Sequence, residues 1–160
     1  MWPLIADLYT PLLAIGVGWM LFREHKIRAG LVFLPLSLLM VFAFSFLESQ
    51  LGLWRSWGLD FSTHTAILLP FYQMLLVLML LPADPHGQKN PGWILRLKQG
   101  AALITALVTG AGYGLLMMQL NYHTLADILT TVVSIYPLVW ICFHLLKPMA
   151  FAAPPAERAA

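Results

Sequence analysis

Residues 30–47 read GLVFLPLSLLMVFAFSFL, a run of apolar and small residues without a single charged side chain. A helix needs about 20 predominantly apolar residues to cross the hydrocarbon core of a membrane. A helix at the surface of a soluble protein keeps a polar face, whereas this run is apolar on all sides. The stretch therefore predicts a transmembrane helix.

Four further stretches have the same character, at residues 4–22, 61–83, 99–122 and 125–146. Of the 160 residues, 60% are hydrophobic and 10% are charged, with a mean hydropathy of +0.78. Soluble domains carry roughly a quarter of charged residues, so the composition excludes a soluble globule. The formal net charge of +2 offers no basic surface for nucleic acid. The sequence thus predicts an all-α polytopic membrane bundle of five transmembrane helices.

The loop charges predict how this bundle is oriented. Basic residues are concentrated in residues 23–28 and 84–98 and in the C-terminal segment. Because positive residues remain on the cytoplasmic side, we expect the N-terminus outside and the C-terminus in the cytoplasm of a bacterial inner membrane. We expect one transmembrane domain over residues 1–150, with a turn-rich cytoplasmic loop at 82–92 and a short disordered tail at 151–160.

Two imidazoles and three carboxylates lie at the predicted outer ends of these helices. They are Glu48, Asp60, His64, His123 and Asp127. His123 and Asp127 are four residues apart, which puts them on one face of a helix. Ionisable side chains at membrane depth are costly, and they usually face a cavity or a partner. The cluster therefore predicts a functional site on the outer side of the membrane.

The residues around the two histidines resemble two signatures of the type 2 phosphatidic acid phosphatase superfamily. Residues 62–65, STHT, resemble the second signature, PSGHT. His123 and Asp127 match the histidine and the aspartate of the third signature, SRxxxxxHxxxD. The resemblance covers about the last hundred residues of the chain. It implies a helical membrane bundle with an outward-facing site.

The resemblance also implies a reaction and a role for each residue. His123 takes up the phosphoryl group, Asp127 orients its ring, and His64 protonates the leaving oxygen. The implied activity is that of a lipid-phosphate phosphatase or phosphotransferase, which needs no cofactor and has membrane lipid as its partner. The implied substrate-binding residues are Arg55, Ser62 and Thr63.

Departures from the signatures leave two alternatives open. Where the first signature, KxxxxxxRP, has lysine and proline, this chain has Glu48 and Ser56, and Met117 replaces the arginine of the third. The loss of two basic side chains and the gain of a carboxylate favour binding of a metal cation over a phosphate anion. One alternative is therefore a site for divalent zinc, iron or manganese. Its ligands would be Glu48, Asp60, His64, His123 and Asp127.

The second alternative is a non-catalytic membrane subunit on a degenerate phosphatase scaffold. Its partner would be another membrane protein or further copies of the same chain in a homo-oligomer. A face of small residues over 110–114, GAGYG, would allow the close helix packing that such a role needs.

Overall fold

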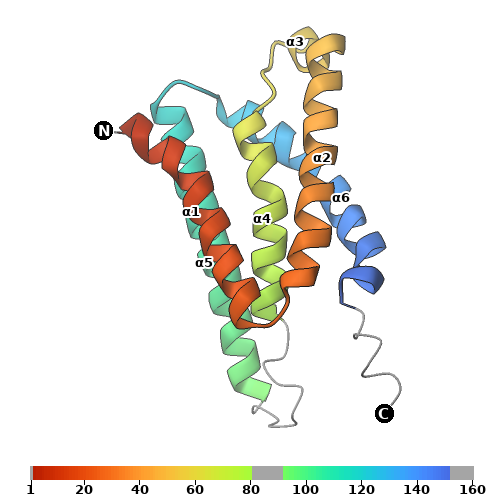
Figure 1. Cartoon of the computed structure of the whole chain (residues 1–160). Coiled ribbons are helices and arrows are strands. Elements are labelled where there is room, and N and C mark those ends of the chain that lie inside the picture. Colours follow the sequence, from red (N-terminus) through yellow and green to blue (C-terminus); the bar gives the residue numbers. More distant parts are fainter. Residues whose placement is uncertain (1, 81–91, 152–160) are drawn as a thin grey trace.

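The structure is a computed structural model that describes residues 2–80 and 92–151. These residues form six helices joined by turns and short connections (Figure 1). Five of them are long and apolar enough to cross a membrane, and the described ranges contain no strand. This confirms the predicted all-α polytopic bundle. Nearly all of the predicted tail (151–160) and of the predicted 82–92 loop lies outside the described residues. The helices are α1 (Trp2–Arg23), α2 (Ile27–Leu51), α3 (Leu53–Ser56), α4 (Thr63–Leu80), α5 (Gly92–Gln119) and α6 (Leu125–Ala150).

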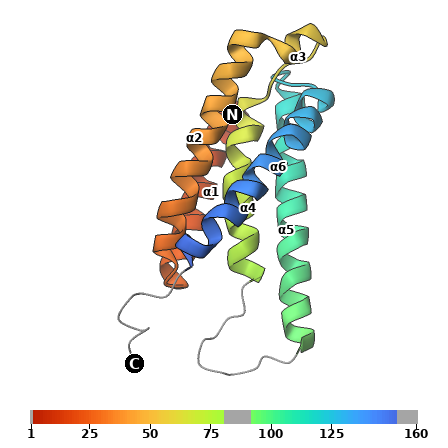
Figure 2. The same ribbon diagram turned by 90° about the vertical axis from the view of Figure 1, so that its right-hand side faces the viewer.

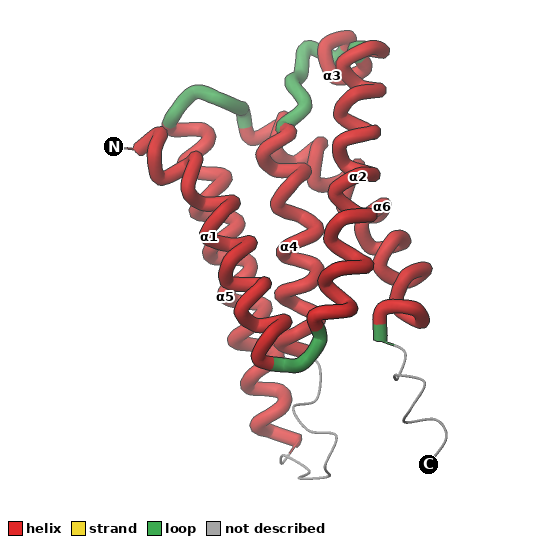
Figure 3. Tube along the Cα trace, viewed as in Figure 1, coloured by secondary structure: helices red, strands yellow, loops and turns green. Residues whose placement is uncertain are grey.

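Successive long helices run in opposite directions (Figures 1 and 3). The ends of α2 and α5 therefore meet the starts of α4 and α6 at one end of the bundle, which we call the site end. The opposite end includes Arg23 at the end of α1, Arg28 at the start of α2 and Lys147 near the end of α6. These three of the basic residues that predict the cytoplasmic side thus lie at the end away from the site.

Helix α4 is the centre of the bundle and packs against each of the other four long helices (Figures 1 and 2). Half of the residues in the apolar span of α4 are buried inside the protein, compared with about a fifth or less in each of the other spans. Its buried residues range from small to large, and Ala66, Pro70 and Met74 are fully buried. The residues at the start of α4 are consequently held by helices on several sides.

The outer surfaces of the peripheral helices are apolar. Leu31 on α2, Leu107 on α5 and Val133 on α6 are each at least 70% exposed. Exposing such large apolar surfaces to water is unfavourable, whereas exposing them to the hydrocarbon core of a membrane is not. Together with the helix lengths, this surface makes the chain an integral membrane protein.

Side-chain hydrogen bonds join the helices inside this apolar shell. The Tyr136 hydroxyl on α6 donates to Oε1 of Gln73 on α4 at 3.0 Å, and the Tyr9 and Tyr72 hydroxyls join α1 to α4. Because lipid supplies no hydrophobic driving force between helices, such bonds and close packing stabilise a membrane bundle.

The sequence prediction missed the short helix α3. Gly52 ends α2 in the left-handed region, with φ +62°, and Gly58 follows α3 with φ +70°. These positive φ values favour glycine and turn the chain sharply. Residues 52–62, which we call the α2–α4 connection, therefore fold over the site end and do not extend as a simple loop.

Candidate functional site

The α2–α4 connection is hydrogen-bonded to the first turns of α6. The Trp54 indole N–H donates to the Thr130 hydroxyl at 3.0 Å, and the Ser62 backbone N–H donates to the Thr131 hydroxyl at 3.0 Å. Asp127, Thr130 and Thr131 share one face of α6 by their spacing. This face fixes the position of the connection, and it was not singled out from the sequence.

Asp127 carries the most important of these contacts. Its Oδ1 accepts the backbone N–H of Asp60 at 2.7 Å. Its Oδ2 accepts the backbone N–H and the hydroxyl of Thr124, both at 2.7 Å. Thr124 in turn caps α6, so the two residues form a capping box. One buried carboxylate therefore holds the backbone on both sides of the site.

The two histidines lie close together on the site end. His64 is in the first turn of α4, and His123 is in the turn that precedes α6. Their ring centroids are 6.4 Å apart and the rings are inclined at 58°. The His64 side chain is exposed, whereas the His123 side chain retains 9% exposure. Two imidazoles from distant segments of the chain thus lie side by side.

The carboxylate that faces the His123 ring belongs to Asp60. Its Oδ2 lies 3.4 Å from Nδ1 of His123, and the Asp60 side chain is 74% exposed. Within the described part of the chain, this buried Nδ1 has no partner in hydrogen-bond geometry. The resemblance implies that Asp127 orients the ring, but the Asp127 oxygens bind backbone and the Thr124 hydroxyl instead.

Burial lowers the pKa of His123 below its usual value of 6.5. The carboxylates of Asp60 and Asp127 act in the opposite direction, and the neighbouring His64 lowers the pKa further. Removing an imidazolium from water is costly, and here this cost exceeds the attraction of the two carboxylates. The lowered pKa favours the neutral imidazole, which keeps a lone pair on one ring nitrogen.

Glu48 stabilises the start of α3 through both of its oxygens. The Leu53 N–H donates to Oε2 at 3.1 Å and the Trp54 N–H donates to Oε1 at 2.9 Å. The Glu48 side chain is buried, and the carboxylate meets the positive end of a helical turn. Its negative charge is thus compensated locally.

Glu48→Ala is expected to lower the free energy of unfolding by about 2 kcal/mol, because two backbone N–H groups lose a charged acceptor. Glu48→Gln keeps one acceptor oxygen and should cost about half as much. Thermal unfolding in detergent micelles measures both effects. The matched control is Glu24→Gln at the opposite end, where no loss is expected, and a loss there equal to that of Glu48→Ala would contradict this assignment.

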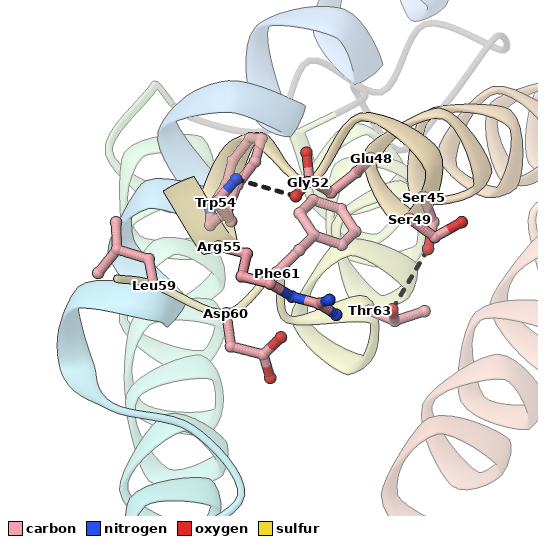
Figure 4. A pocket seen from close by; sticks show the side chains of 10 residues that line it. All are labelled: Ser45, Glu48, Ser49, Gly52, Trp54, Arg55, Leu59, Asp60, Phe61 and Thr63. Atoms are coloured by element: carbon pink, nitrogen blue, oxygen red, sulfur yellow. Dashed lines mark hydrogen bonds between the residues drawn. The ribbon is translucent and has the colours of Figure 1, made fainter. Parts of the chain in front are cut away.

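The remaining predicted substrate-binding residues have different surroundings. Ser62 is fully buried, and its hydroxyl accepts the Thr65 N–H at 3.3 Å as a cap of α4. Thr63 and Arg55 line a pocket of about 210 Å³ between the end of α2 and the α2–α4 connection (Figure 4). Asp60 and Glu48 also line it, but neither histidine does. Asp60 therefore borders both the pocket and the histidine pair.

The alternative metal site has fewer available donors than the sequence implies. Glu48 and Asp127 are occupied by backbone N–H groups, which leaves Asp60 and the two imidazoles. Among residues 2–80 and 92–151, no three histidine, cysteine, aspartate or glutamate side chains are grouped as metal ligands.

The fold and this site define an α-helical, polytopic integral membrane protein with a histidine–carboxylate cluster at one end. Comparison with protein-family models, with curated proteins and with solved structures finds no match.

Proposed function

We propose that the protein is a lipid-phosphate phosphatase or phosphotransferase that works through a phosphohistidine at the outer face of the membrane. The observation that carries the proposal is the pair of imidazoles 6.4 Å apart, one with a carboxylate at its Nδ1. A nucleophile, an orienting group and a second proton-transfer group are the parts that covalent phosphoryl transfer needs.

The proposed reaction gives each ring nitrogen a role. Because Nδ1 of His123 faces Asp60, Nε2 is the nitrogen free to attack phosphorus. The Nε2–P bond forms as the P–O bond to the lipid alcohol breaks, and protonated His64 gives its proton to the leaving oxygen. Water then attacks phosphorus, His64 takes up the proton, and the N–P bond breaks to release phosphate. In transfer to another alcohol, that hydroxyl replaces the water.

Local charge compensation supports binding of an anion. Phosphoryl transfer depends on positive charge around the phosphate, so two uncompensated carboxylates would oppose it. Backbone N–H groups hold both Glu48 and Asp127, however, and Arg55 borders the same region. Asp60 is then the remaining exposed carboxylate of the cluster, and Arg55 lines the same pocket as Asp60.

Phosphate release from phosphatidic acid by the purified protein in nanodiscs tests the proposal. We expect turnover that survives a metal chelator, and an acid-labile phosphoprotein after rapid quenching. Vesicles without protein, and protein carrying His144→Ala on the exposed surface of α6, are the controls. Wild-type protein that neither releases phosphate nor forms a phosphoprotein would refute the proposal.

The pH dependence of turnover provides a second measurement. Since burial lowers the pKa of His123, the nucleophile stays neutral until the pH falls below 6.5. The acid limb of the rate profile should therefore have its midpoint below 6.5. Asp60→Asn removes a carboxylate that raises this pKa, so its acid limb should move to still lower pH. A shift toward higher pH would contradict the assignment of Asp60.

A further inference from the structure

The pocket beside the histidine pair has a lining that the proposed reaction does not use fully. Its hydroxyl groups come from Ser45 and Ser49 on α2 and from Thr63 on α4. Its volume of about 210 Å³ is below the roughly 300–1,000 Å³ of pockets that enclose drug-sized ligands. It can therefore take a small polar group, but not an entire lipid.

Two opposite charges at this pocket remain available to a ligand. Glu48 has both oxygens bound to backbone N–H groups, whereas one oxygen of Asp60 and the Arg55 guanidinium are uncommitted in the described part of the chain. Figure 4 shows the Arg55 side chain extending toward Thr63 with the Asp60 carboxylate on the same side, away from Glu48. No ion pair within 4.0 Å joins Arg55 to Asp60 among the described residues.

Two of the lining residues share a face of α2 with an exposed aromatic residue. Phe42, Ser45 and Ser49 are spaced three and four residues apart, so they follow one face of the helix. Phe42 is 52% exposed and lies on the bilayer side of the two serines. On the connection above, Trp57 is 67% exposed, as expected for an aromatic residue at the headgroup level.

We propose that this pocket binds the headgroup of a zwitterionic phospholipid with a primary ammonium group, of the phosphatidylethanolamine type. The Arg55 guanidinium binds the phosphodiester through paired N–H donors. The Asp60 carboxylate and the serine hydroxyls accept from the ammonium, and an acyl chain lies along Phe42. This lipid is bound and not cleaved, so the site goes beyond the proposed reaction and does not depend on turnover.

Native mass spectrometry of protein released from nanodiscs tests this site. The nanodiscs contain equal amounts of phosphatidylethanolamine, phosphatidylglycerol and phosphatidylcholine with identical acyl chains. We expect one phosphatidylethanolamine to be retained about fivefold more than either of the other two lipids. This factor is what one weak, exposed ion pair between the ammonium and Asp60 would contribute. Equal retention, or preference for either of the other lipids, would overturn the proposal.

Variants separate the two charges. Arg55→Gln should lower the retention of all three lipids, whereas Asp60→Asn should remove only the preference for phosphatidylethanolamine over phosphatidylglycerol. Arg28→Gln and Glu24→Gln remove one charge of each sign at the opposite end and should change nothing. If the site variants behave as these controls do, the proposal is wrong.

Two further measurements on wild-type protein identify the ligand, and a third on His123→Ala separates this site from the proposed reaction. N-acetylated phosphatidylethanolamine lacks the ammonium and should be retained about fivefold less by wild-type protein. Soluble phosphoethanolamine should not displace the retained lipid at equal concentration, and displacement would assign the site to a soluble compound instead. His123→Ala should retain the lipid as wild type does, which distinguishes failure of this site from failure of the proposed reaction.

Discussion

His123→Ala is expected to reduce phosphate release from phosphatidic acid by at least about a thousandfold, because it removes the attacking nitrogen. We expect no second nucleophile to replace it, since the proposed reaction assigns the neighbouring His64, 6.4 Å away between ring centroids, to the leaving group. The acid-labile phosphoprotein should disappear together with turnover. The measurement compares initial rates in nanodiscs at matched protein content.

The matched control separates the loss of the nucleophile from a general effect of histidine removal. His144→Ala removes an exposed imidazole that stacks on Trp140, far along α6 from the site. Its turnover should remain near that of wild type. Retention of phosphate release by His123→Ala, with a phosphoprotein still present, would exclude His123 as the nucleophile.

Asp127→Ala is expected to lower the free energy of unfolding by about 3 kcal/mol. The substitution leaves the backbone N–H groups of Asp60 and Thr124 without their charged acceptor and removes half of the capping box of α6. It should also abolish turnover, because both segments that carry the His123–Asp60 pair lose their anchor. Chemical or thermal unfolding in micelles measures the first effect, and phosphate release measures the second.

Asp60→Asn is the comparison that defines this role. It removes an equivalent charge from an exposed side chain but keeps the backbone N–H that Asp127 accepts. It should therefore cost much less stability than Asp127→Ala and change the pH profile instead. Equal destabilisation by the two substitutions would show that Asp127 does not act as the anchor.

The five spans could be predicted from sequence because each depends on local properties. A run such as 30–47 crosses the membrane through its length and hydropathy alone, and the observed α2 differs from it only by additional turns at its ends. The alternation of spans then places Glu48, His64 and His123 at one end without any knowledge of side-chain contacts. Helix α3 was not predicted because four residues are too few to show a helical pattern of apolar residues. Its start also depends on hydrogen bonds to the Glu48 carboxylate.

Which groups each carboxylate of the site contacts depends on tertiary structure. A spacing of four residues suggests that Asp127 faces His123, but the helix starts between them, and the Asp127 side chain turns back to Thr124 and across to Asp60. The capping-box pattern T-x-x-D of residues 124–127 was visible in the sequence and indicates the first of these contacts. The second joins segments far apart in the chain, so no local pattern encodes it.

The sequence by itself thus determined the class of the protein, the number of spans and the end of the bundle where the polar residues gather. Hydropathy and helix length act within each segment, and the membrane converts them directly into topology. Tertiary structure alone decided which carboxylate faces His123, which ones are occupied by backbone, and where Arg55 lies relative to the pocket. These depend on hydrogen bonds and packing between α2, α4 and α6, whose relative placement arises only when the helices assemble.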